Sequence, residues 1–237
     1  SGLGLMAYAW LKEPALRFQR SFKPARGAAG EIQRFAFSSS IQQSVMNFGI
    51  LMIQGLVNSF GKEVMAAFAA AVKIDSFAYM PAQEFGNAFS LFISQNHGAG
   101  QKERVKEGMK SALRVSLCFC ALISCLVFLC APVLMLMFIE PQETAIIAQG
   151  VQYLRVEGAF YCGIGILFLL YGYYRGINRP EMSLVLTIIS LGTRVLLAYA
   201  LAPISWIGVL GIWSAIPIGW FLADLAGILY LKKAARK

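Results

Sequence analysis

The chain has 237 residues, of which 58% are hydrophobic and only 14% are charged, and its formal net charge is +9. Ordinary soluble domains are roughly 45–50% apolar and about 25% charged, so this composition excludes a water-soluble globule, including a soluble enzyme. The excess of Lys and Arg does not indicate a nucleic-acid partner, because these residues separate apolar runs of membrane length instead of forming a basic stripe.

The apolar runs predict an all-α membrane protein, a polytopic bundle of six transmembrane helices preceded by the end of another helix. Residues 1–11 are apolar but too short to cross a bilayer, which needs about 20 helical residues, and we interpret them as the end of a truncated transmembrane helix. Residues 12–34 are a basic cytoplasmic linker, either solvated or resting on anionic headgroups. Residues 35–231 form the six-helix transmembrane lobe, and residues 232–237 form a basic cytoplasmic tail. The predicted spans are 35–61, 64–94, 115–139, 158–174, 182–202 and 207–231.

The positions of Lys and Arg predict how the lobe is oriented in the membrane. Most of the 21 basic residues lie in the linker, in predicted loops at 95–114 and 175–180, and in the tail, whereas the opposite loops contain only Lys62. The positive-inside rule therefore puts both ends of the chain in the cytoplasm and the loop at 140–149 outside.

The first predicted span carries a stripe of amide side chains. At 100° per residue, four amides fall within about 60° of one another on one helix face: Gln43, Asn47, Gln54 and Asn58. An amide is unfavourable in hydrocarbon unless it finds a partner or water, so this face contacts a neighbouring helix or a wet cavity. Hydrogen bonding between helices is the simpler interpretation, but the stripe is longer than one contact needs, which favours the wall of a substrate cavity.

The second predicted span holds charges inside the membrane, namely Lys73, Asp75 and Glu84, with Pro81 between the two acids. Such charges usually mark an ion or substrate path. Lys73 and Asp75 lie roughly 14–17 Å from the start of the span at 1.5 Å per residue, which is mid-bilayer. Arg194 reaches a comparable depth in the fifth span and is a candidate partner for Asp75, and a purely structural ion pair is the alternative. Pro81 removes a helix hydrogen bond and is expected to kink the helix, a feature used for gating.

Asp75 is the first candidate for an ion-coupling residue. Glu84, near the cytoplasmic mouth, and Glu157, near the outer boundary, are lesser candidates. For Glu157 the alternative is a side chain that reaches water at the membrane surface. Tyr79 lies on the same predicted helix as Asp75 and offers a ring for cation-π contact with cargo.

The sequence predicts no catalytic set and no metal site. The five cysteines form no CxxC pair, and the single histidine has no companion for catalysis or zinc binding. We therefore expect neither enzyme activity nor a cofactor.

The loop after the second span carries a family resemblance. Residues 95–104 resemble the QN-x-GAG-xxx-R loop of the multidrug and toxic compound extrusion (MATE) transporters, and the similarity extends over about residues 34–231. The motif residues are Gln95, Asn96, Gly98, Ala99, Gly100 and Arg104. Members of that family have twelve spans in two pseudo-symmetric six-helix lobes. The resemblance therefore implies that this chain is the second lobe and that its partner is a missing N-terminal lobe.

The resemblance implies secondary active efflux of small organic, often cationic, drugs across the lipid bilayer by alternating access, driven by inward flow of Na⁺ or H⁺. It also implies an integral protein of the bacterial inner (plasma) membrane. Some relatives place acids in helix seven and in the middle of helix ten, where this chain has Met46 and Ile164. Any acidic role in this lobe therefore falls to the acids named above, with Asp75 first. The alternative is a coupling site that lies wholly in the missing N-terminal lobe.

Two other functions fit the sequence less well. A lipid-linked saccharide flippase of related architecture needs several cavity cations for pyrophosphate, and the predicted spans offer only Lys73, Arg155 and Arg194. A non-transport membrane scaffold needs no acid at mid-membrane depth.

Overall fold

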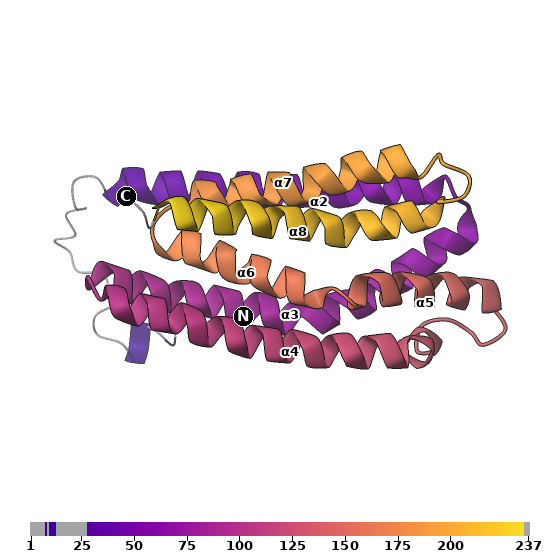
Figure 1. Ribbon diagram of the computed structural model, residues 1–237, viewed down its shortest axis with the longest axis horizontal. Coiled ribbons are helices and arrows are strands. Elements are labelled where there is room, and N and C mark those ends of the chain that lie inside the picture. Colours follow the sequence, from indigo (N-terminus) through magenta and orange to yellow (C-terminus); the bar gives the residue numbers. More distant parts are fainter. Residues whose placement is uncertain (1–7, 9, 13–27, 235–237) are drawn as a thin grey trace. The chain divides into compact units, whose positions relative to one another are not determined.

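Figure 1 shows the structure, a computed structural model that describes residues 8, 10–12 and 28–234. The chain divides into two compact units, Ser1–Phe37 and Ser38–Lys237, and the second unit holds the helical lobe. In the first unit, residues 8 and 10–12 are helical and a long helix begins at Ala28. Residues 28–34 are thus helical, although the sequence predicted a linker there. The other residues of the predicted truncated helix and linker, and residues 235–237 of the predicted tail, lie outside the described residues.

Helices build the described part of the lobe, and no strand occurs among its described residues. The helices are α2 (Ala28–Asn58), α3 (Lys62–Gly98), α4 (Lys102–Leu136), α5 (Thr144–Gly158), α6 (Tyr161–Gly176), α7 (Pro180–Leu201) and α8 (Val209–Ala234).

The predicted spans are confirmed in part. By length and composition α3, α4, α7 and α8 can each cross a membrane, and α5 with α6 forms a fifth crossing if this pair, bent by 53°, is one broken span. The predicted span at 158–174 therefore belongs to a longer, interrupted element that begins at Thr144. Helix α2 is 31 residues long, but its Ser, Gln and Asn side chains lower its hydropathy, and its crossing stays a prediction.

The prediction of a basic loop at 95–114 is wrong, because most of these residues are helical. Helix α3 continues to Gly98 and α4 begins at Lys102, so only a short turn separates them. Gly100 has a φ of +71°, a conformation that a side chain would strain, and the Gln101 amide donates to the Asn96 carbonyl over 2.8 Å. The residues after the turn are mostly good helix formers, so the helix begins before the apolar run does.

Close contact between α3 and α6 sets the register of the lobe. A Cβ added at Gly172 would lie 2.3 Å from the Gly86 carbonyl oxygen, and one at Gly176 would lie 2.9 Å from that of Ser90. Figure 1 shows that the two helices run in the same direction. Glycines let helix backbones approach closely in membranes, where hydrophobic burial between helices is weak.

Helix α6 lies between two other groups of helices (Figure 1). On one side it contacts α3 and α4, and on the other α7 and α8, which pack extensively on each other. Phe68 of α3, Tyr153 of α5 and Trp213 of α8 form an aromatic cluster in the core, with ring centroids 4.9–5.7 Å apart. Phe68 stacks on Trp213, and Tyr153 meets both rings edge-on. Helix α4 instead leaves an apolar stripe exposed, as a lipid-facing helix does: Leu122, Leu126, Leu129 and Val133.

The glycine contact leads to a prediction about stability. Gly172→Ala should destabilise the lobe by about 1–3 kcal/mol, because the new methyl group forces two backbones apart. Gly192→Ala is the matched control: a Cβ there meets nothing within 4 Å, and alanine favours a helix by up to about 1 kcal/mol. Thermal unfolding in detergent measures both, and equal melting temperatures for the two variants would contradict the assigned contact.

Candidate functional site

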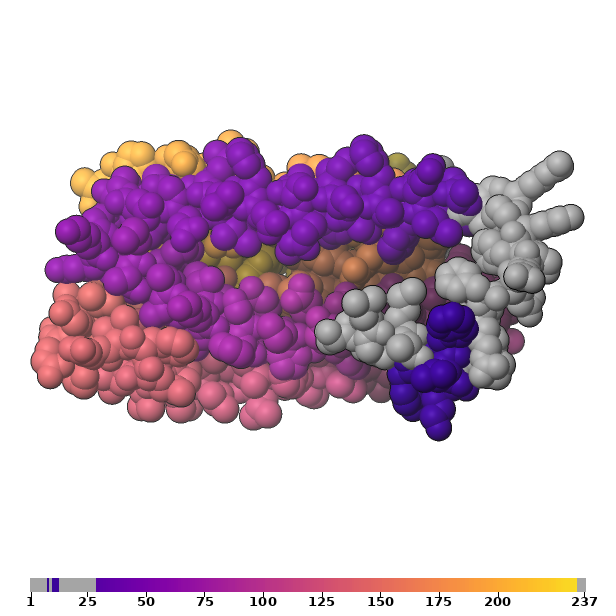
Figure 2. All heavy atoms as spheres, turned by 180° about the vertical axis from the view of Figure 1, so that it is seen from behind, coloured from indigo at the N-terminus to yellow at the C-terminus, as the bar shows by residue number. Residues whose placement is uncertain are grey.

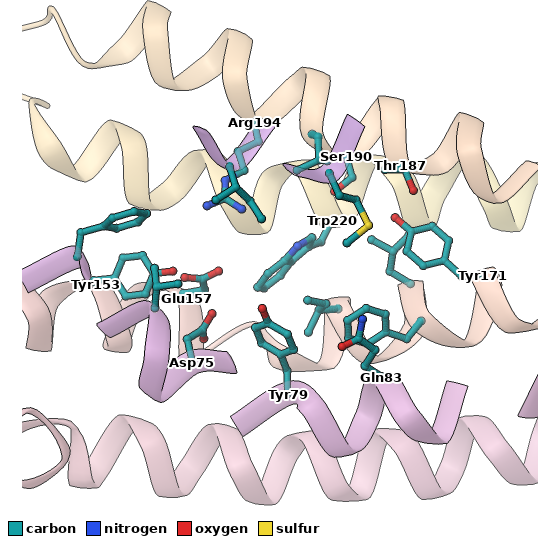
Figure 3. A pocket seen from close by; sticks show the side chains of 18 residues that line it. Asp75, Tyr79, Gln83, Tyr153, Glu157, Tyr171, Thr187, Ser190, Arg194 and Trp220 are labelled. Atoms are coloured by element: carbon teal, nitrogen blue, oxygen red, sulfur yellow. The ribbon is translucent and has the colours of Figure 1, made fainter. Parts of the chain in front are cut away.

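A cavity lies inside the lobe, among α2, α3 and α5 to α8 (Figure 3). Its volume is about 150 Å³. Its walls are mainly apolar and aromatic, with a few polar side chains: Asp75, Tyr79, Gln83, Tyr153, Glu157, Tyr171, Thr187, Ser190 and Arg194. Figure 3 shows Asp75, Glu157 and Tyr153 gathered at one end, with Gln83, Tyr171 and Thr187 at the other. The cavity thus has an acidic end and an uncharged polar end.

Asp75 lies on α3 and is buried, with 4% of its surface exposed. Its Oδ1 accepts a hydrogen bond from the Tyr161 hydroxyl over 2.5 Å. Tyr161 is the first residue of α6, and it reaches Asp75 through the same register that pairs Gly172 with Gly86. A buried carboxylate needs such a donor, because its charge is strongly disfavoured in an apolar interior.

Glu157 lies in the last turn of α5, next to the break before α6. Its side chain is 2% exposed, and its Oε2 has no hydrogen-bond partner among the described residues. The alternative of a side chain that reaches water therefore does not apply in this structure. Arg155, two residues earlier, does point outward, and its guanidinium lies 5.6 Å from the centre of the Phe128 ring.

Arg194 of α7 points into the cavity from the side opposite α3 (Figure 3). Its Nε has no hydrogen-bond partner in the described part of the chain. The direct pairing of Arg194 with Asp75 that the sequence predicted is not formed within that part, where Tyr161 binds Asp75 instead. The cavity therefore holds two carboxylates and one guanidinium that surround a small space without closing on each other.

This arrangement can bind a cation. With both acids ionised and Arg194 charged, the site has one negative charge in excess among the described residues. Uncompensated charge is costly in an apolar interior, so a proton or a small hard cation would stabilise the site. The carboxylate oxygens of Asp75 and Glu157 are the donor type that hard cations prefer.

The other charged candidates on α3 lie outside this cavity. Lys73 is exposed and is not among the residues that line it. Glu84 is exposed as well, and it accepts a hydrogen bond from Asn87 over 3.3 Å. Helix α3 continues through Pro81, which is exposed, and Figure 1 shows α3 bending along its length. Tyr79, on the same helix, does line the cavity beside Asp75.

The amide stripe of α2 faces away from the main cavity. All four of its members are exposed and none lines that cavity: Gln43, Asn47, Gln54 and Asn58. Gln43 donates to Asn47 over 3.2 Å and lines a cavity of about 140 Å³ between α2, α3 and α6, which adjoins the main cavity and shares Gln83 and Tyr171 with it. Figure 2 shows a groove between α2 and α3. One end of the stripe, Gln43, thus lines a cavity, whereas Asn47, Gln54 and Asn58 lie on the outer surface. Met46 and Ile50 are the α2 residues that enter the main cavity.

The residues of the loop motif have a structural role here. Asn96 is buried, and its side-chain amide donates to the Phe92 carbonyl over 2.8 Å. Gly98 ends α3, Ala99 and Gly100 make the turn, and Gln95 and Arg104 are exposed on either side of it.

The sequence did not single out several polar residues that line the cavity, among them Gln83, Tyr153, Thr187 and Ser190, nor Tyr161, which binds Asp75. Hydroxyl groups recur throughout these helices, and periodicity does not distinguish an inward face when the whole helix is apolar. Asp224 of α8 is also buried, with an unpartnered Oδ1 within the described residues, but it does not line the cavity.

Curated relatives share this sequence over most of its length. The chain is 28% identical to the probable multidrug resistance protein YpnP of Bacillus subtilis (strain 168) over 203 residues, covering 85% of this chain and 44% of the relative. It is 25% identical to the probable multidrug resistance protein NorM of Thermotoga maritima, covering 90% and 46%. It is also 29% identical to the FAD transporter of Shewanella oneidensis, covering 74% and 38%. The chain thus spans about half the length of the first two relatives or less.

Solved structures share the fold. An outward-facing multidrug resistance MATE family transporter of the MOP superfamily aligns with a TM-score of 0.88 at 22% identity, covering 97% of this chain and 52% of that one. A MATE structure in complex with MaL6 aligns equally well, at 22% identity with 97% and 53% covered.

The MatE family model matches residues 36–200, which is more than half of the chain. This match agrees with the relatives and with the shared fold. The chain therefore belongs to the MatE family of integral membrane transport proteins, which are not enzymes.

Proposed function

We propose that this chain forms one lobe of a multidrug efflux transporter that exchanges organic compounds for Na⁺ or H⁺ by alternating access. The observation that carries the proposal is the cavity in which Asp75, Glu157 and Arg194 meet inside an otherwise apolar lobe. Intramembrane charges are costly and usually functional. The names of the relatives, which refer to multidrug resistance, support export as the direction of transport.

The coupling step follows from the charge of this cavity. When the cavity is open to the outside, a cation enters and neutralises the excess carboxylate charge beside Arg194. A neutral site is less hydrated, so the helices around it can close. A later opening toward the cytoplasm releases the cation, and the cycle repeats. The broken pair α5–α6 is the natural moving element, because its bend of 53° lies between Glu157 and Tyr161.

Cargo is proposed to bind on the outer surface of the lobe, along the groove beside α2 (Figure 2). The exposed amides Gln43, Asn47, Gln54 and Asn58 need water or a partner in a membrane. A second lobe across this groove would supply both a cover and an aqueous cargo path. The share of the relatives that this chain covers, 44% and 46% for the first two, supports a second lobe of similar size.

The first test replaces Asp75 by Asn in the protein expressed from its complete coding sequence. We expect the variant to fold, to bind cargo and to lose the Na⁺ or pH dependence of efflux, because the amide cannot carry the charge that attracts the cation. Efflux of a fluorescent organic cation from vesicles with an imposed ion gradient measures this. Glu63→Gln, which removes an exposed acid from the same helix, should leave coupling unchanged.

Two results would contradict the proposed role of Asp75. One is normal ion-coupled efflux in a well-expressed Asp75→Asn protein. The other is a variant that fails to express but regains both expression and efflux when Arg194→Gln is added, which would make Asp75 part of a structural ion pair.

A double-mutant cycle tests the contact between Asp75 and Tyr161. Tyr161→Phe should lower the free energy of unfolding by about 1–3 kcal/mol, because it leaves a buried carboxylate without its donor. In the Asp75→Asn background, Tyr161→Phe should lower the free energy of unfolding by clearly less. Tyr199→Phe is the control: it removes from α7 an exposed hydroxyl that donates to the neutral Met52 carbonyl over 3.3 Å, and it should cost less than Tyr161→Phe because no buried carboxylate loses a donor. Thermal unfolding of the wild type, the two single variants and the double variant gives the coupling free energy between Asp75 and Tyr161. A coupling free energy near zero would remove Tyr161 from the site.

The class of ligand that stabilises the protein separates the three candidate functions. We expect planar organic cations to raise the melting temperature of a drug exporter. A lipid-linked saccharide flippase would respond to polyprenyl pyrophosphates, and a scaffold to neither. FAD belongs in the same panel, because one relative is named as an FAD transporter.

A further inference from the structure

A second, larger cavity lies at the end of the lobe where α3 turns into α4. Its volume is about 680 Å³, and side chains from α3, α4, α6, the α6–α7 turn and α8 line it. It shares no residue with the cavity that holds Asp75. A volume in this range accommodates a small ligand.

Three of the lining cations come from one face of α4. Lys102, Lys106 and Lys110 are spaced by four residues, so they lie on the same side of the first turns of the helix. The amino-terminal end of α4 adds the partial positive charge of its unpaired amide groups. An anion beside these turns would therefore be attracted by the side chains and by the backbone.

A fourth cation faces them from the α6–α7 turn. Arg179 lines the cavity, and its Nη1 donates to the Tyr230 hydroxyl of α8 over 2.9 Å. The ring of Tyr230 in turn lies 5.9 Å from that of Tyr174, which is completely buried and bonded to the Gly227 carbonyl. The guanidinium is thus hydrogen-bonded to a ring that packs on the buried core. His97 adds one more nitrogen-bearing side chain to the lining.

The cavity has an excess of positive charge. None of its lining residues in the described part of the chain is acidic. Glu103 lies 3.9 Å from the Lys106 ammonium, but its side chain is 81% exposed, so water screens this pair strongly. Like charges around one space repel each other, and a bound anion would relieve that repulsion.

The remaining wall of the cavity is apolar. It includes Val105, Met109, Ile177 and Leu231, each of them half-buried. This composition coincides with a change along α4, which carries charges from Lys102 to Arg114 and none from Val115 to Leu136. The cavity therefore lies at the level where the helix leaves the polar headgroup layer and enters hydrocarbon.

We propose that this cavity binds the headgroup of an anionic phospholipid, with its phosphate among the lysines of α4 and Arg179. A free phosphate ester shares the anionic chemistry, but it would leave the apolar wall without a contact. Basic pockets between transmembrane helices on the cytoplasmic side are suited to anionic headgroups, and the predicted orientation puts this end of the lobe on that side. Occupancy would tie the turn between α3 and α4 to the ends of α6 and α8.

Native mass spectrometry of the protein from its complete coding sequence tests the proposal. We expect one phosphatidylglycerol to stay bound in preference to phosphatidylcholine. The variant Lys102→Gln/Lys106→Gln/Lys110→Gln should raise the Kd for phosphatidylglycerol roughly a hundredfold, from the contribution of each Lys to binding an anionic surface. The control Arg104→Gln/Lys232→Gln/Lys233→Gln removes three exposed cations that do not line the cavity and should change the Kd little.

Several outcomes would overturn the proposal. If the two triple variants lose the same affinity for phosphatidylglycerol, the lipid is attracted by general positive charge and not by this cavity. If phosphatidylcholine is retained as well as phosphatidylglycerol, the protein has no preference for a charged headgroup. Full displacement of the lipid by glycerol phosphate at comparable concentration would assign the cavity to a soluble phosphate ester. If the triple cavity variant fails to fold, the single variant Lys106→Gln takes its place in the Kd measurement. An unchanged Kd for phosphatidylglycerol in Lys106→Gln would reject the site.

Discussion

Close approach of the α3 and α6 backbones is the constraint on which the interior of the lobe depends. Gly86 faces Gly172, and Asp75 meets Tyr161 at the same sequence separation of 86 residues. Because the helices run in the same direction, one register produces both contacts (Figure 1). A larger side chain at the glycines would therefore disturb more than local fit. It would also move the Tyr161 hydroxyl away from Asp75 and leave that buried carboxylate without its hydrogen-bond donor.

The break between α5 and α6 has a comparable consequence. It leaves Glu157 at the end of one helix and Tyr161 at the start of the next, so both side chains reach the region of Asp75. A continuous helix over the same residues would place these two side chains one turn apart along a single line. The interruption thus lies between two polar side chains of the site, in a segment whose length and composition suit a single crossing.

The polar groups of the lobe fall into three separate places. The inner cavity holds the acids and Arg194, the exposed face of α2 carries the amides, and the α3–α4 end holds the lysines. Each place suits a different partner: a small cation where carboxylates are buried, an organic cargo or second lobe where amides need cover, and an anion where ammonium groups gather. This separation fits the proposed exchange of an ion for cargo, because the two would have to bind without blocking each other.

The sequence by itself determined the fold class and the positions of most helices, because runs of apolar residues long enough for a bilayer leave the chain few alternatives. It also singled out Asp75, Glu157, Tyr79 and Arg194, since charges and rings stand out against an apolar background. It singled out Lys73 and Glu84 as well, because both are charges within a predicted span. It placed the amides of α2 on one face without showing where that face points.

Only the tertiary structure decided which of these residues meet. Helix rotation put Asp75 inside the lobe and Lys73 outside, although the two are separated by one residue. The sequence left Glu157 either as an ion-coupling acid or as a side chain that reaches water, and the fold buries it beside the interruption before Tyr161. Such choices depend on glycine contacts and helix breaks between segments far apart in the chain, and the energy of those contacts does not appear in the periodicity of any single segment.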